Sequence, residues 1–224
     1  MIQIAIDGPS GAGKSTVAKA VAKKLGIVYV DTGALYRTIG YYVRTQNVDP
    51  KDAAGVEALL PDIKVELKYE NGAQIVLLNG ENLGDRIRTP EMSLYASAVS
   101  AIPAVRAFLL ETQREIARTN SVIMDGRDIG TVILPHADVK IFLTASDECR
   151  ATRRRDELLA KGIKTTYEEV LADMQTRDAN DRNRSVAPAV AAPDAITLDN
   201  SWFTIEQSCD AVVELVKKTV GEKL

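Results

Sequence analysis

The sequence predicts an α/β fold in which a five-stranded parallel sheet is flanked by helices. Short apolar runs alternate with segments of helical periodicity along the 224 residues, and this alternation is typical of a parallel sheet. A glycine-rich segment joins the first predicted strand to the first predicted helix. The length suits one sizeable core, so we interpret residues 1–224 as a single domain, although length alone also allows two.

The predicted core strands are short and mostly apolar. Residues 2–7 form an almost wholly apolar run that ends in Asp7, as expected for a strand buried on both faces. The five predicted strands are Ile2–Asp7, Ile27–Val30, Ser121–Asp125, Val139–Leu143 and Ala195–Leu198.

The predicted helices are placed by apolar spacing and by signals at their ends. The first follows the glycine-rich segment, and Gly26 closes it. Two later helices begin at capping boxes, in which Thr166 pairs with Glu169 and Thr204 with Gln207. Other helices are expected over 34–45, 90–100, 103–118 and 147–160.

The glycine-rich segment is the first functional motif. It matches the pattern G-x-x-x-x-G-K-[ST] throughout and continues to Thr16, with the residues Gly8, Pro9, Ser10, Gly11, Ala12, Gly13, Lys14, Ser15 and Thr16. Small residues let backbone N–H groups point at phosphate oxygens, and the next helix adds its positive N-terminal dipole. Lys14 is expected to contact the β and γ phosphates, and the Ser15 hydroxyl to ligate Mg²⁺. The motif predicts a bound nucleoside triphosphate; the alternative is a glycine-rich turn with a solvated lysine.

Two segments interrupt the α/β alternation, and we expect both to lie over the active site. Residues 63–83 alternate apolar and polar positions around Asn-Gly pairs at 71–72 and 79–80, which predicts a small antiparallel meander and a separate subdomain. The second segment is strongly basic. A solvated helix is one interpretation of it, but beside a phosphate-binding loop we favour a mobile lid. Its basic residues are Arg150, Arg153, Arg154, Arg155, Lys161 and Lys164.

Two further motifs follow predicted strands. Asp125 ends an apolar strand, as expected of a carboxylate that holds Mg²⁺ directly or through water, although a strand-end aspartate is often only a turn former. Residues 31–37 leave the second strand at the edge where open α/β sheets bind ligands. With Thr32 as the helix cap, Arg37 lies about one turn inside the helix. Its side chain is either a clamp on a phosphate or an ordinary surface charge, and the sequence leaves both interpretations open.

Arg177, Asp181 and Arg184 are spaced i, i+4, i+7 on a predicted helix and therefore share one face. Taken alone, this spacing favours an ion-pair ladder that stabilises the helix over a catalytic role.

Composition limits the possible partners. The net charge of −3 and the isoelectric point near 5.4 disfavour nucleic acid or an anionic membrane as the main partner. Apolar stretches fall well short of the ~18 residues of a membrane span, and the first residues do not resemble a signal peptide. We therefore expect a cytoplasmic protein. Cys149 and Cys209 fit no metal or redox spacing, which favours buried free thiols.

Together these motifs resemble the bacterial cytidylate kinase family, in order and over nearly the whole chain. The resemblance implies a P-loop kinase fold with five parallel strands, a monophosphate-binding region near 37–110 enlarged by the antiparallel insert, and a short basic lid near 150–166. It also implies a monomer that transfers the γ-phosphoryl group of ATP to CMP or dCMP with Mg²⁺. The segments that carry it are 8–16, 31–37, 87–90, 125–131 and 181–188.

The resemblance also implies roles for single residues. The clamp on the monophosphate falls on Arg37, Arg127 and Arg184. The groups that read cytosine fall on Ser97, Arg106 and Asp128, and the pentose contacts on Arg177 and Asp181.

Further positions match the family's pattern less directly. Thr32 keeps a hydroxyl where some relatives have serine, and Tyr36 lines the acceptor pocket. The lid arginines correspond to Arg153 and Arg154, while Arg150 and Arg155 match only in some registers of the lid. Charge on the transferring group is neutralised by Lys14, Arg127, Arg153, Arg154 and Arg184.

Other nucleotide-binding classes fit less well. Adenylate kinase and shikimate kinase share the first twenty residues in outline, but they do not account for the meander together with Ser97 and Asp128. A regulatory GTPase needs an N-K-x-D element, which this sequence lacks. An ATPase that binds nucleic acid is disfavoured by the net charge.

Overall fold

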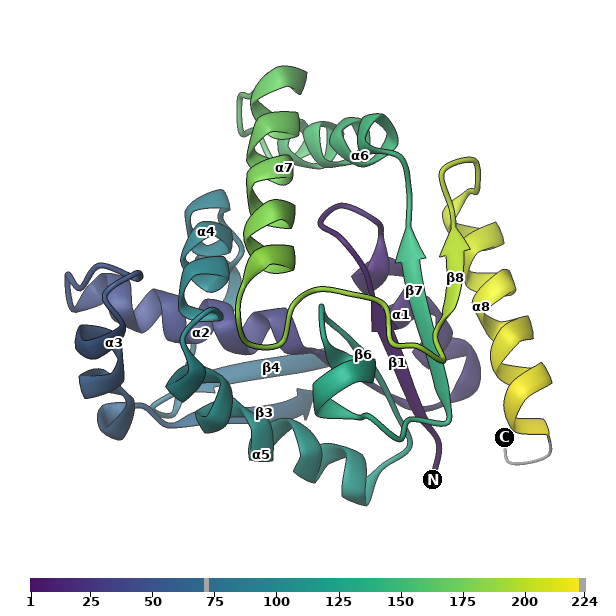
Figure 1. The fold of residues 1–224 in the computed structure, drawn as a ribbon, viewed down its shortest axis with the longest axis horizontal. Coiled ribbons are helices and arrows are strands. Elements are labelled where there is room, and N and C mark those ends of the chain that lie inside the picture. The colour runs from purple at the N-terminus through teal and green to yellow at the C-terminus, as the bar shows by residue number, and fades with distance from the viewer. Residues whose placement is uncertain (71–72, 222–224) are drawn as a thin grey trace.

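The computed structural model describes residues 1–70 and 73–221, and it confirms the predicted five-stranded parallel sheet (Figure 1). The strand order is β2-β6-β1-β7-β8, and every neighbouring pair is parallel. Because β6 lies between β1 and β2, their carboxyl ends meet at one edge of the sheet. The strands are β1 (Gln3–Asp7), β2 (Val28–Asp31), β6 (Val122–Asp125), β7 (Val139–Thr144) and β8 (Ile196–Asp199).

Helices cover both faces of this sheet. Alternate residues of a strand point to opposite faces, so Ile4 and Ile6 pack with α1 and α8, whereas Ala5 packs towards α5 and the π-helical turn η3. A separate small cluster joins α6 to α7, and these two helices stand above the carboxyl edge of the sheet (Figure 1). The helices are α1 (Lys14–Leu25), α2 (Thr32–Thr45), α3 (Ala53–Leu59), α4 (Pro90–Val99), α5 (Pro103–Thr119), η3 (Ile129–Ile133), α6 (Asp147–Ala160), α7 (Tyr167–Asn183) and α8 (Ile205–Val220).

The predicted meander forms a three-stranded antiparallel sheet of β3 (Val65–Glu70), β4 (Ala73–Leu78) and β5 (Glu81–Asn82). Its second turn is confirmed, because Asn79 and Gly80 have φ of 50° and 84°, as a type I′ hairpin turn requires. The first turn, at 71–72, lies outside the described residues. The sheet shares a core with α2 and α5, and the Gln74 side chain bonds both backbone groups of Asp31 at the end of β2.

Both predicted capping boxes are present, at Thr166 with Glu169 and at Thr204 with Gln207. The cap of α2 differs from the prediction. Asp31, not Thr32, is the N-cap, since its carboxylate accepts the Ala34 N–H at 2.9 Å.

Sequence patterns missed several short elements. These are α3, the turn η3 and two 3₁₀ turns, η1 (Leu60–Asp62) and η2 (Gly84–Ile87). Each has seven residues or fewer, too few for apolar periodicity to identify.

No single helix among residues 1–70 and 73–221 is long and apolar enough to cross a membrane. Only α4 and α5 taken together reach that length and composition, and they meet at an angle of 101°. Both cysteines carry free thiols, as expected, but only Cys209 is buried; Cys149 is half-buried.

Candidate active site

A cavity of about 870 Å³ opens at the carboxyl edge of the parallel sheet. It is bounded by the loop between β1 and α1, by α2 and α4, and by α6 and α7. All predicted site residues line it except Gly8, Pro9 and Ala12. Gly8 instead meets a packing need: at φ 146° its absent Cβ would lie 2.0 Å from the carbonyl oxygen of Leu143. The cavity therefore joins the predicted triphosphate loop to the predicted acceptor residues.

The phosphate loop ends at Gly13, whose φ of 85° suits glycine and whose carbonyl accepts the first backbone bond of α1 from Val17. Lys14 Nζ donates to the carbonyl oxygen of Pro9 at 2.7 Å, so the side chain arches back across its own loop. Burial lowers the pKa of Lys14 to about 7, with a smaller contribution from Arg127. An anionic ligand beside this amine favours its charged form.

Two hydroxyls hold the carboxylate of Asp125. Ser15 Oγ donates to Oδ2 at 2.8 Å, and Tyr29 Oη donates to Oδ1 at 2.7 Å. Burial raises the pKa of Asp125, and the nearby Asp31 adds to that effect. A hydroxyl beside a carboxylate gives oxygen ligands of the kind that Mg²⁺ shares with phosphates and water. Within the described residues no three His, Cys, Asp or Glu side chains cluster as a metal site.

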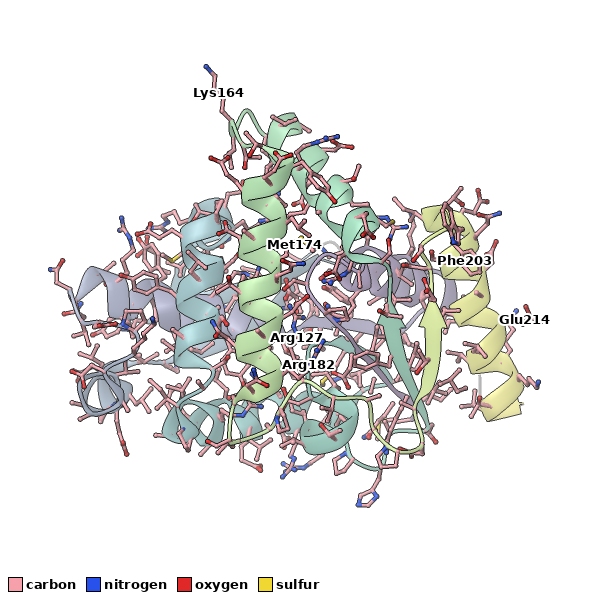
Figure 2. The ribbon with its side chains drawn as sticks, turned by 45° about the horizontal axis from the view of Figure 1, so that its top comes forward. Arg127, Lys164, Met174, Arg182, Phe203 and Glu214 are labelled. Atoms are coloured by element: carbon pink, nitrogen blue, oxygen red, sulfur yellow. The ribbon has the colours of Figure 1, made fainter. Side chains whose placement is uncertain are left out.

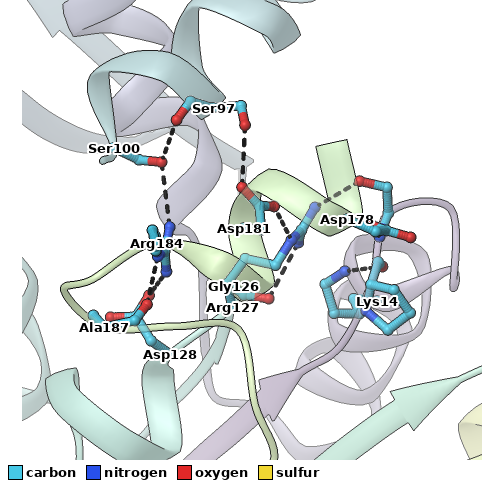
Figure 3. Close-up of polar contacts among 12 residues, drawn as sticks. Lys14, Ser97, Ser100, Gly126, Arg127, Asp128, Asp178, Asp181, Arg184 and Ala187 are labelled. Atoms are coloured by element: carbon cyan, nitrogen blue, oxygen red, sulfur yellow. Dashed lines mark hydrogen bonds and ion pairs between the residues drawn. The ribbon is translucent and has the colours of Figure 1, made fainter. Parts of the chain in front are cut away.

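At the centre of the cavity, Arg127 joins the loop to α7 (Figure 3). Its Nε donates to Asp181 Oδ2 at 3.0 Å and its Nη2 to Ser10 Oγ at 3.1 Å. Ser97 of α4 donates to the other oxygen of Asp181 at 3.1 Å. A residue predicted to contact phosphate, Arg127, and one predicted to contact the pentose, Asp181, are thus joined by a hydrogen bond.

The far end of the cavity is built around the buried carboxylate of Asp128. Arg106 donates to one of its oxygens and Arg184 Nη2 to the other, at 3.2 Å. Burial raises the pKa of Asp128 even though both arginines oppose that shift. Ser100 and Tyr36 complete this end: Ser100 Oγ accepts from Arg184, and the Arg106 guanidinium lies over the Tyr36 ring, 5.6 Å from its centroid.

Arg184 lies beyond the helix on which we predicted it, because α7 ends at Asn183 and Arg184 is its C-cap with φ −64° and ψ 142°. The three-residue helical face is therefore wrong in part: Arg177 and Asp181 share the helix, and Arg184 does not. Its Nε donates to the carbonyl oxygen of Ala187 at 2.5 Å. The extended backbone turns the guanidinium towards Asp128.

Arg37 and Arg177 are two predicted contacts whose side chains are incompletely paired. Arg37 Nη2 donates to Asp31 at 2.9 Å. Burial opposes ionisation of Asp31, but Arg37 and Arg88 outweigh it and lower its pKa. The Nε atoms of Arg37 and Arg177 are buried without a hydrogen-bond partner among the described residues. Burial lowers the pKa of Arg177 to about 10 because it disfavours the charged guanidinium. An anion bound beside Arg177 would favour the charged form again.

The basic run on α6 does not present its arginines uniformly. Arg153 donates to the carbonyl oxygens of Asn200 and Phe203 at 2.9 and 3.3 Å, and Arg154 pairs with Glu157. Arg155 pairs with its neighbour Asp156 and does not line the cavity.

Two other basic residues of this run also do not face the cavity as residues of a phosphate-binding lid would. Arg150 is buried at the base of α6, where it contacts Ser10. Lys164 projects away from the tip of the α6–α7 pair (Figure 2). Ion pairs with Asp147 of α6 and Asp178 of α7 hold Arg150 in this position.

Sequence patterns missed several residues that hold the site. Tyr29 sits in an apolar strand, where its hydroxyl gives no signal. Asn200 binds the carbonyl oxygen of Ala12 at 3.1 Å from the end of β8, a contact that only the tertiary structure creates. Asp178 follows the predicted Arg177 directly, and that proximity was the one available indication.

Comparisons with known proteins agree with the geometry. Residues 4–218 match the sequence model of the family described as cytidylate kinase. Cytidylate kinase of Fervidobacterium nodosum is 48% identical over 216 residues, covering 96% of each chain. Cytidylate kinase of Caldicellulosiruptor saccharolyticus is 46% identical over 223 residues, covering 100% of this chain and 99% of that protein.

A solved structure supports the fold alone. An uncharacterized protein from Eubacterium ventriosum superposes with a TM-score of 0.54 at 13% identity, over 97% of this chain and 99% of that one. Identity near one half over essentially the full length of the named relatives is decisive for the family. This chain belongs to the cytidylate kinase family of phosphotransferases.

Proposed function

We propose that the protein transfers the γ-phosphoryl group of ATP to CMP or dCMP, with Mg²⁺, and releases ADP and CDP or dCDP. The observation that carries this proposal is the single cavity that joins Lys14 and its loop to the buried Asp128. ATP occupies the loop end and the cytidine nucleotide the Asp128 end. The membership of the chain in the cytidylate kinase family supports the same reaction.

The acceptor requires no strong base. An oxygen of the CMP phosphate is already anionic, and it attacks the γ-phosphorus while the bond from that phosphorus to the β–γ bridging oxygen breaks. The electron pair of the broken bond stays on ADP. The protein's task is to hold the two anions in line and to neutralise the charge on the transferring group.

Positive charge for this task comes from both ends of the cavity. Lys14 reaches the β and γ phosphates. The acceptor phosphate is held by Arg37, Arg127 and Arg184. Ser15 and Asp125, the latter directly or through water, would hold Mg²⁺, which would supply further positive charge to the same phosphates. Arg153 and Arg154 reach the transferring group from α6, after exchanging their present partners for phosphate oxygens.

The cytosine ring is read by a carboxylate. Cytosine presents an amino group at position 4 where uracil presents a carbonyl, and a carboxylate accepts from the first and repels the second. Asp128 supplies that group, with Arg106 and Ser97 fixing the rest of the ring. The pentose hydroxyls are held by Asp181 and Arg177.

Closure of α6 and α7 over both nucleotides excludes water and so suppresses hydrolysis of ATP. We further propose that the protein works as a monomer in the cytoplasm. Two free thiols suit a reducing compartment.

A panel of nucleoside monophosphates assayed with ATP and Mg²⁺ tests this function. We expect rapid formation of ADP with CMP and dCMP, and slow formation with AMP, GMP and UMP. A preference for AMP would favour adenylate kinase, and turnover of GTP without any acceptor would favour a GTPase. Gel filtration of the same preparation tests the monomer.

A further inference from the structure

One residue of the phosphate loop is held by two side chains from the helices above it. The backbone N–H of Ser10 donates to Asp178 Oδ1 at 2.9 Å. Its carbonyl oxygen accepts from Arg150 Nη1 at 2.6 Å. The same Arg150 nitrogen donates to Asp178 Oδ2 at 2.5 Å, which closes a ring of contacts around the backbone of one residue. Both backbone groups of Ser10 therefore depend on α6 and α7.

This ring is buried and electrostatically balanced. The side chains of Arg150 and Asp178 are only 6% and 10% exposed, so the pair acts in a poorly screened environment. Asp147 also accepts from Arg150, at 2.5 Å. Burial lowers the pKa of Arg150, but these two carboxylates outweigh it and raise the pKa. Removal of Arg150 leaves the buried Asp178 without this counter-charge, and removal of Asp178 leaves Arg150 with Asp147 alone; both changes are costly.

The packing around Gly11 brings the same helices against the next residue of the loop. A Cβ built on Gly11 would lie 2.9 Å from Met174 Cε and 3.2 Å from Arg150 Cβ. The turn of the loop at Ser10 and Gly11 is thus shaped from outside by α6 and α7.

Helix α7 reaches both ends of the cavity. Asp178 contacts the donor loop, whereas Asp181, one turn later, contacts Arg127 and Ser97 on the acceptor side. Residues three apart on a helix lie close together and move as one rigid unit. A shift of α7 that follows the acceptor therefore also moves the group that holds Ser10.

We propose that Asp178 and Arg150 are positioning residues, which hold the turn of the phosphate loop at Ser10 and couple the binding of ATP to the binding of CMP through α7. Neither side chain needs to touch a substrate. The inference rests on the proposed function, because it takes the loop as the ATP site and α7 as a part of the CMP site.

The test measures binding rather than turnover. The affinity of the β,γ-imido analogue of ATP with Mg²⁺ is determined by calorimetry, with and without saturating CMP, for the wild type and Asp178→Asn. The asparagine keeps the size and one acceptor for Ser10 but cannot neutralise Arg150. Asp173→Asn is the matched control, because Asp173 is exposed on the same helix. Arg150→Lys, which cannot make all three contacts at once, is the second variant.

In the wild type, we expect CMP to tighten binding of the analogue. Asp178→Asn should weaken analogue binding about tenfold, the size expected when one hydrogen bond to a charged group is lost, and should bring the effect of CMP close to none. Arg150→Lys should act in the same direction, and Asp173→Asn should match the wild type.

Two results would overturn the proposal. One is an affinity within twofold of the wild type in folded Asp178→Asn and Arg150→Lys proteins; the other is an effect of CMP that both variants retain. Lower melting temperatures with unchanged binding would make the ring a purely structural contact. The panel of acceptors on the wild type judges the proposed function separately, because it involves neither variant.

Discussion

Arg184 and Asp128 form an ion pair across the acceptor end of the cavity, with Nη2 3.2 Å from Oδ1, although 56 residues separate them in the sequence. Both side chains are about 5% exposed or less. Arg106 binds the other carboxylate oxygen, so Asp128 is held between two guanidinium groups. The group that reads the base is therefore fixed in place by the same arginine that is assigned to the phosphate.

This pairing makes the base preference sensitive to Asp128. In the wild type we expect CMP to be preferred over UMP by far more than the ~10-fold that one ordinary hydrogen bond gives, because a buried carboxylate without its donor is costly. Asp128→Ala should erode the preference mainly by harming CMP. The measurement is kcat/KM for both acceptors.

Asp128→Asn provides the matched control for volume. Its amide can offer a donor to uracil, so the variant should tolerate UMP better than Asp128→Ala does. Comparable wild-type values for CMP and UMP would contradict the assigned reaction. A strong preference that survives both substitutions would move the reading of the base to another residue.

Asp181 and Arg184 should respond differently to removal. Asp181→Ala should raise KM for CMP, since a sugar contact is equally present in the ground and transition states. Arg184→Ala should mainly lower kcat, because a contact to the transferring group strengthens as charge shifts. Steady-state kinetics with CMP separates the two effects.

Because Arg184 is also paired with Asp128, two results would contradict its assignment to the phosphate. A change confined to the ratio of CMP to UMP would show that Arg184 serves to hold Asp128 rather than the phosphate. Unchanged kinetics with lower melting temperatures in both variants would leave only helix-end ion pairing.

Lys14→Ala should abolish turnover and leave the fold intact, because among residues 1–70 and 73–221 the amine hydrogen-bonds only to the carbonyl oxygen of Pro9 in its own loop. We expect a loss on the order of 10³-fold or more in kcat, as removal of a major charge from the transition state produces. Lys23→Ala, an exposed lysine on the same helix, is the control. Near-normal turnover in a folded Lys14→Ala protein would refute the donor assignment.

Asp7 should make stability depend on pH. Its carboxylate accepts the N–H groups of Ile129 and Gly130, each at 2.8 Å, yet burial raises its pKa to about 6 despite those bonds. An acid with a raised folded-state pKa binds more protons folded than unfolded, so its contribution to stability falls as pH rises from about 4 through 6.

Asp7→Asn removes this titration. The free energy of unfolding of the wild type, measured in urea relative to Asp7→Asn, should therefore fall by about 1 kcal/mol between pH 5 and pH 7. A difference that is constant with pH, or that grows as pH rises, would contradict the raised pKa.

The sequence predicted the parallel sheet well because its strands are short apolar runs bounded by clear turn residues. The loop at 8–15 and the carboxylate of Asp125 could be placed because their chemistry is tied to local spacing. Contacts made by single polar side chains between distant segments could not be predicted. Tyr29 on Asp125, Asn200 on Ala12 and Asp178 on Ser10 all depend on tertiary packing.

Arg184 illustrates a different limit. Its spacing predicted that it shares one helical face with Arg177 and Asp181. That prediction required the helix to include Arg184, and the ends of helices are difficult to predict to within one or two residues. One residue beyond the end of α7, the extended backbone sends its side chain elsewhere. Arg153 was assigned to the lid through the family resemblance, but the structure pairs it with Asn200 and with the carbonyl oxygen of Phe203, contacts that only tertiary packing creates.

The position of β6 between β1 and β2 has a consequence for synthesis of the chain. β1 pairs only with β6 and β7, and β2 pairs only with β6, within the part of the chain that the structure describes. A nascent chain of 120 residues can form the local pairing of β3 with β4, but β1 and β2 have no strand to pair with until β6 is made. Fragments that end before β6 should therefore aggregate, and productive folding should wait until the second half of the chain has left the ribosome.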